Sequence, residues 1–120
     1  MLKIGSVLNH MNSITDYWSP KIIAEIGDKY VKLAKFKGDF IWHNHENEDE
    51  LFYVIKGSFD LHLEEEIITL NKGDYYVVKK GLNHKPVANE ECLVMLIEKK
   101  NTKHTGDIET DVTKSIEEQL

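Results

Sequence analysis

Residues 38–57 of the chain read GDFIWHNHENEDELFYVIKG. His43 and His45 stand two residues apart, so on a β-strand both side chains would point to the same face of the sheet. The acidic and amide residues that follow are too polar for a buried strand and predict a turn, after which an apolar strand begins at Glu50. If these two strands form a hairpin, Glu50 lies beside the two histidines. Two imidazoles and one carboxylate at one place form a site suited to a divalent transition metal.

A second stretch, residues 73–84, reads GDYYVVKKGLNH and predicts a strand, a glycine turn and a histidine, His84, that opens the next strand. Together the two stretches resemble the two sequence motifs of the cupin family. The first contains a glycine, the His-x-His pair, a glutamate after four further residues and a glycine after six more. The second contains Gly73, Gly81 and His84 in the expected places. The resemblance covers residues 38–89 closely and the flanking strands loosely.

The two stretches depart from the family pattern in three places. Gly38 lies one residue nearer to His43 than is usual, and Lys79 stands where the family has proline. The asparagine expected four residues after His84 is Ala88, with Asn89 one place later. None of these departures removes a residue that would bind metal.

The resemblance implies an all-β fold, a double-stranded β-helix or jelly roll. It also implies that one divalent transition metal, Fe, Mn, Ni, Cu or Zn, is held by four residues: His43, His45, Glu50 and His84. Glu48 and Asp49 are rival carboxylates, but Glu50 alone has the spacing to Gly57 that the motif requires and faces inward with Phe52. In enzymes that this site resembles, such as quercetin and acireductone dioxygenases, the glutamate can also serve as a base. Glu50 is therefore also the candidate catalytic residue.

The pattern of short apolar segments agrees with a closed β architecture. We expect a strand that carries His-x-His, and further strands near 21–26, 29–36, 51–56, 58–63, 66–70, 74–79, 84–88 and 92–98. This divides the chain into an N-terminal arm (1–20), a β-barrel (21–100) and a C-terminal tail (101–120). The arm fits a short helix or an edge strand equally well. In the tail, Val112, Ile116 and Leu120 recur every four residues, a helical stripe that is either frayed or docked on the barrel or a partner.

The composition excludes some classes of function. The formal net charge is −6, whereas proteins that bind nucleic acid present a basic face. All basic residues are lysines, and the absence of arginine weakens a sugar-phosphate substrate, since arginine is the usual forked partner of phosphate. No apolar run approaches the roughly 20 residues that span a bilayer. The single cysteine, Cys92, excludes an internal disulfide, and we expect a cytoplasmic protein.

Two functions remain open at this stage. The first is a metal-dependent enzyme of dioxygenase or isomerase type that acts on a small molecule in a largely apolar pocket, because Phe52 and Val54 share the face of Glu50. The second is a binding module without turnover, a sensor or storage barrel that holds a metal or ligand. An apolar arm on a small barrel, and the usual state of the family, also predict a homodimer.

Overall fold

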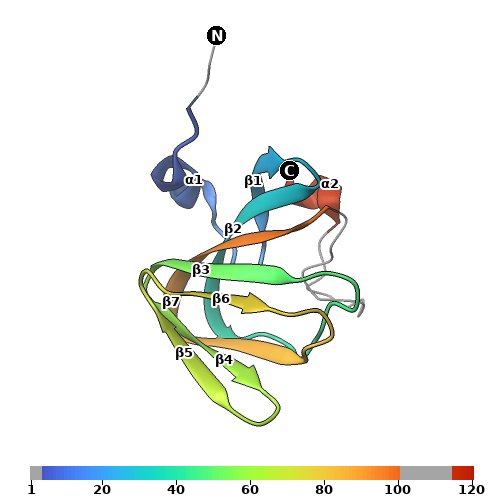
Figure 1. The fold of residues 1–120 in the computed structure, drawn as a ribbon. Coiled ribbons are helices and arrows are strands. Elements are labelled where there is room, and N and C mark those ends of the chain that lie inside the picture. Colours follow the sequence, from blue (N-terminus) through green and yellow to red (C-terminus); the bar gives the residue numbers. More distant parts are fainter. Residues whose placement is uncertain (1–3, 101–114) are drawn as a thin grey trace.

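The computed structural model describes residues 4–100 and 115–120 (Figure 1). The described residues form seven β-strands and two short helices. In chain order these are α1 (Val7–Ser13), β1 (Lys21–Ile26), β2 (Lys29–Asp39), β3 (Glu50–Lys56), β4 (Ser58–Leu63), β5 (Ile67–Asn71), β6 (Tyr75–Val78), β7 (His84–Lys99) and α2 (Ile116–Gln119).

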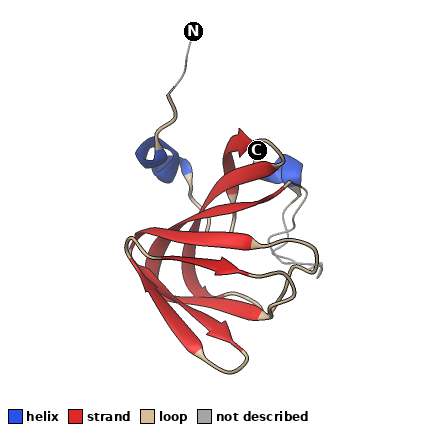
Figure 2. Ribbon diagram, in the orientation of Figure 1, coloured by secondary structure: helices blue, strands red, loops and turns tan. Residues whose placement is uncertain are grey.

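The strands pair in an antiparallel arrangement around the long strand β7. The sheet runs in the order β1-β2-β7-β3-β6, and β4 pairs with both β7 and β5. One half of β7 pairs with β2 and β3, while its first residues pair with β4. The sheet therefore curves around an enclosed interior, as the strands in Figure 2 show. The predicted all-β jelly roll is confirmed.

The core lies inside this curved sheet and follows from the alternation of side chains along each strand. Phe36 packs edge to face against Phe52 and Phe59, with ring centroids 6.3 and 5.2 Å apart. Around these rings lie buried aliphatic residues from β2, β3, β4, β5, β6 and β7: Ala34, Val54, Leu61, Leu70, Val78, Val94 and Leu96. Cys92 is buried among them, and burial raises the pKa of its thiol to about 12, so it is a packing residue.

Two predictions about individual strands were wrong. The expected break at Asn89-Glu90 does not exist, because β7 continues through both residues as an exposed part of one 16-residue strand. The pairing of β7 with β2 changes register at this point, between Phe36 and Gly38 of β2. This irregularity accommodates the polar residues of β7 within one continuous strand. The expected His-x-His strand is also absent: His43 forms only a single bridge, to His84, and the chain then enters a loop.

The N-terminal arm contains a helix rather than an edge strand. Ser6 caps α1 by accepting a hydrogen bond from the Asn9 amide, and the chain then returns to the barrel. Tyr17 forms a bridge with Lys35 of β2, and Trp18 donates its amide to the same residue's carbonyl. The arm therefore lies against β2 of its own barrel.

The C-terminal helix α2 begins with a capping box formed by Ser115 and Glu118. Gln119 is buried, and residues 118–120 line a cleft together with residues 13–16 and 19–21 of the arm. Val112, a member of the predicted helical stripe, lies outside the described residues. No helix among residues 4–100 and 115–120 is long and apolar enough to cross a membrane.

Candidate metal centre

Two of the histidines are presented by one backbone bridge. The amide of each of His43 and His84 donates to the carbonyl of the other, at 3.0 and 2.9 Å. Each ring also donates from Nδ1 to a carbonyl two residues earlier, His43 to Ile41 at 2.9 Å and His84 to Leu82 at 2.8 Å. These bonds fix the ring orientation and leave Nε2 as the nitrogen with a lone pair, which is how metal-binding histidines are held.

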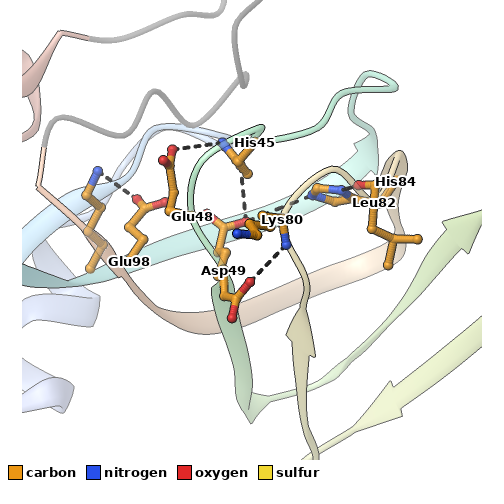
Figure 3. A network of polar contacts seen from close by, with 9 residues as sticks. His45, Glu48, Asp49, Lys80, Leu82, His84 and Glu98 are labelled. Atoms are coloured by element: carbon orange, nitrogen blue, oxygen red, sulfur yellow. Dashed lines mark hydrogen bonds and ion pairs between the residues drawn. The ribbon is translucent and has the colours of Figure 1, made fainter.

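The third histidine comes from the loop that precedes β3. The carbonyl of His45 accepts the amide of Gly81, so the loop is tied to the turn that precedes His84. His43, His45 and His84 each have one ring nitrogen that lies within 4.8 Å of those of the other two, and all three side chains are buried. Figure 3 shows His45 and His84 approaching one centre from different elements. The structure thus brings the three predicted histidines together.

Glu50, the first residue of β3, completes this group. Its Oε1 lies 3.5 Å from His45 Nε2 and 3.9 Å from His84 Nε2, and its side chain is 2% exposed. His84 Nε2 is also shielded from solvent and has no hydrogen-bond partner among the residues described. A buried nitrogen in this state is costly unless something binds it. The donor set and the buried nitrogen both fit a divalent transition metal that is held by the four residues.

The rival carboxylates have other positions. Asp49 accepts the Lys80 amide at 2.9 Å, and this hydrogen bond holds the pKa of its carboxyl below the usual value (Figure 3). Glu48 is partly exposed, and its Oε1 lies 3.9 Å from His45 Nδ1, on the other side of the ring from Glu50. Asp49 therefore anchors the loop, and Glu48 contacts His45 from outside the cluster.

Burial controls the charge of the site. Desolvation lowers the pKa of His84 to about 4, so its imidazole is neutral at physiological pH, the form that binds metal. Desolvation also raises the pKa of the Glu50 carboxyl, against the opposing effects of the neighbouring Glu98 and the charge of Lys32. Metal binding would compensate for the burial of the Glu50 charge.

The sequence interpretation missed two buried charged residues behind Glu50. Lys32 of β2 and Glu98 of β7 form an ion pair of 2.7 Å, and neither side chain is exposed. Glu98 is the direct cross-strand neighbour of Glu50, and burial together with the Glu50 charge raises the pKa of Glu98 well above its usual value. The signal in the sequence was alternation: Lys32 shares the inward face with Ala34, and Glu98 shares it with Leu96.

An apolar pocket with a volume of about 20 Å³ opens beside the cluster. His43 and Glu50 lie in its wall, and the other lining residues are Trp18, Pro20, Ala34, Phe36, Phe40, Phe52, Pro86 and Leu96. The ring of Trp18 stacks on Phe36 and Phe40, with centroids 4.4 and 4.8 Å apart, and its Nε1 donates to the Lys37 carbonyl. Trp18 was not identified from the sequence as a pocket residue.

Comparisons with known proteins agree with this architecture. A sequence profile described as "Cupin domain" matches residues 30–98, a range that includes all four residues of the cluster. The crystal structure of a cupin-2 domain containing protein from Shewanella frigidimarina is 39% identical, covers 81% of this chain and 95% of that one, and superposes with a TM-score of 0.80. The corresponding values for protein NMB1881 from Neisseria meningitidis are 28%, 82%, 100% and 0.75. The uncharacterized protein YdbB of Bacillus subtilis is 29% identical over 101 residues, which cover 83% of this chain and 89% of YdbB.

Proposed function

The chain belongs to the cupin family, and we propose that it is a metal-dependent enzyme of dioxygenase type that acts on a small, largely apolar molecule. One observation carries the proposal. The apolar pocket has His43 and Glu50 in its wall, two of the four proposed metal ligands. A molecule bound there would be surrounded by aromatic and aliphatic side chains and would present one end to the proposed metal.

The residues of the chain divide the chemistry between them. His43, His45, His84 and Glu50 would hold the ion, and the ion would supply a Lewis acid and, as Fe, Mn, Ni or Cu, the redox partner that dioxygen needs. Glu50 would also serve as a base for an acidic hydroxyl of the substrate, since its side chain lies in the wall of the pocket. The aromatic walls exclude water from the reacting groups.

The same pocket argues against a sugar-phosphate isomerase. A phosphorylated sugar needs cationic partners for its phosphate and hydrogen-bond partners for its hydroxyls. Among the described residues, those that line the pocket include no lysine, and their charged or titratable side chains are those of His43 and Glu50. The buried ammonium of Lys32 is already paired with Glu98. An isomerase would therefore have to act on a compound without phosphate.

Metal content tests the first half of this proposal. The full chain would be purified without an affinity tag or added metal, alongside His45→Ala and the matched control His62→Ala, which removes a histidine of β4 outside the cluster. We expect near-stoichiometric Fe, Mn, Ni or Cu in the parent and in the control, and its loss in His45→Ala. Zinc alone, or no metal in any of the three, would contradict a dioxygenase.

Oxygen uptake tests the second half. The metal-loaded parent would be screened with small catechols, enols and other oxidisable apolar compounds in an oxygen electrode. Uptake that depends on one compound and disappears in His45→Ala supports the enzyme. Tight binding of a compound in the pocket without oxygen uptake would instead support the binding module without turnover.

A further inference from the structure

We infer that Lys32 and Glu98 are positioning residues for the metal centre, and that Glu98, held by Lys32, fixes the position of the Glu50 carboxylate. This inference rests on the proposed metal site, since Glu50 is one of its four ligands. Glu98 itself would not bind the ion.

Three adjacent strands bring the groups together. Glu98 of β7 stands directly opposite Glu50 of β3 in the strand register, and β2 pairs with the other edge of β7. One carboxylate oxygen of Glu50, one of Glu98 and one ring nitrogen of His45 lie within 4.8 Å of one another. A line of polar side chains therefore crosses the inner face of the sheet from Lys32 through Glu98 to Glu50 and the histidines.

The Lys32–Glu98 pair is expensive to bury. Removing two charged groups from water costs several kcal/mol each, and an apolar pair of similar size would often be as stable. Stability alone is thus a weak reason for the pair. The pair lies directly behind Glu50, a proposed metal ligand. Residues that contact metal ligands in this way generally hold those ligands in the orientation that binds the metal.

The contacts of Glu98 define that role. Lys32 Nζ lies 2.7 Å from Glu98 Oε1, so the buried ammonium holds the Glu98 side chain in place. Glu98 in turn lies beside Glu50, its direct cross-strand neighbour. Glutamine at position 98 would keep the size and polarity of this side chain and remove only its charge.

A rival explanation is a second cation site formed by His45, Glu50 and Glu98. His45 and Glu50 are already ligands of the proposed centre, so the two sites could not each have a full set of ligands of their own. Glu98, in addition, already has the buried ammonium of Lys32 2.7 Å away. The pair is therefore part of the support of one site rather than half of a second.

Cobalt binding tests the inference without reference to activity. Metal-stripped full chain would be titrated with Co²⁺ and followed by visible absorption, for the parent, Glu98→Gln, Glu98→Leu and the double variant K32M/E98L. Glu98→Leu leaves the buried Lys32 without its partner and so could fail to fold. The double variant avoids this problem because it replaces both buried charges with apolar groups. Glu90→Leu is the matched control, an exposed glutamate on the same strand.

We expect Glu98→Gln and Glu90→Leu to bind Co²⁺ as the parent does, and K32M/E98L to bind roughly 10- to 100-fold more weakly with a changed spectrum. Parent-like binding and spectrum in K32M/E98L would overturn the inference. Glu98→Gln that binds as weakly as K32M/E98L would also overturn it, in favour of a charge effect or direct binding by Glu98.

A parent that binds no Co²⁺ would refute the proposed metal site, and crystal structures would then decide the positioning role. In metal-free K32M/E98L the Glu50 carboxylate should leave the place that it has in the parent. An unchanged Glu50 would overturn the inference.

Discussion

Replacing Lys32 with methionine should destabilise the protein strongly, and more at high pH than at low pH. The lysine is fully buried, and its ammonium lies 2.7 Å from Glu98, which is equally buried. Methionine fills much of the same volume without the charge, so the substitution leaves the apolar contacts of the stem largely in place. What it removes is the counter-charge of a buried carboxyl group.

The magnitude follows from the state of Glu98. Breaking a fully buried ion pair by deleting one partner costs about 3–5 kcal/mol, because the remaining charge is uncompensated. Where Glu98 is protonated the loss is smaller, about 1.5–3 kcal/mol, the contribution of a hydrogen bond to a charged group. The full cost therefore appears only where the carboxyl would otherwise ionise.

The sign of the pH dependence can be worked out from the pKa of Glu98. Burial and the neighbouring Glu50 raise this pKa above its usual value, and Lys32 opposes them, so Lys32→Met raises the pKa further. A carboxyl whose pKa is raised in the folded state binds more protons there than in the unfolded chain. Its contribution to stability is full at low pH and is lost as the pH rises above the unfolded value, by at most about 1.4 kcal/mol per pH unit.

Urea unfolding of metal-free protein at about pH 5 and about pH 8 measures this difference. Lys29→Met is the matched control, since Lys29 begins the same strand, is half exposed and forms only a 3.7 Å surface pair, for which about 0–1 kcal/mol is expected. K32M/E98L should recover most of the loss. A Lys32→Met variant that loses no more than the control at pH 8, or the same amount at both pH values, would refute the reasoning.

Three further predictions concern the turn, the pocket and the histidines. Gly57→Ala should cost about 1–2 kcal/mol for its positive φ and about 1–3 more because the new Cβ would lie 2.8 Å from the Glu91 carbonyl oxygen. Gly73→Ala, which has a similar φ and open space, should cost only the first amount in the same unfolding assay, and equal losses would contradict this. Trp18→Ala should cost about 2 kcal/mol and weaken binding of any pocket ligand, since the ring is half-buried and stacks on two phenylalanines; unchanged binding would show that the ring does not shape the pocket. In metal-free protein the His84 imidazole should titrate near pH 4 by NMR, and the depressed pKa should remove about 3 kcal/mol of stability as the pH falls from 6.5 to 4; a midpoint near 6.5 would be the contrary result.

The sequence was most informative where spacing translates directly into geometry. The two-residue spacing of His43 and His45, and the place of Glu50 at the head of an alternating strand, predicted three groups on one side of the chain. The structure brings these groups and His84 within contact of one another. The detail was different, since His43 lies at a single bridge and His45 in a loop rather than on a strand. The backbone bonds between His43 and His84 take over the positioning that a strand would have given.

Features that depend on contacts distant in sequence could not be predicted in the same way. Trp18 and Phe40 are 22 positions apart along the chain, and their stacking depends on how the arm returns across β2. Lys32 and Glu98 are further apart still, and each on its own is an ordinary strand residue. Only the pairing of β2 with β7 makes them one buried ion pair. Periodicity indicated which face each occupies, but it could not identify the partner.

The charges of the interior link metal retention to stability. Without metal, Lys32 provides one positive charge for two buried carboxyl groups, so one of them must keep a proton or both must share one. A bound divalent ion would compensate Glu50 directly and leave Lys32 for Glu98. A metal that binds only the folded state raises the free energy of unfolding as the concentration of free metal increases. Here the gain would include compensation of the buried negative charge of Glu50. A chelator should therefore lower the unfolding temperature of the metal-loaded parent, and it should do so less in K32M/E98L, in which the proposed support of Glu50 is gone and the metal is already weakly held.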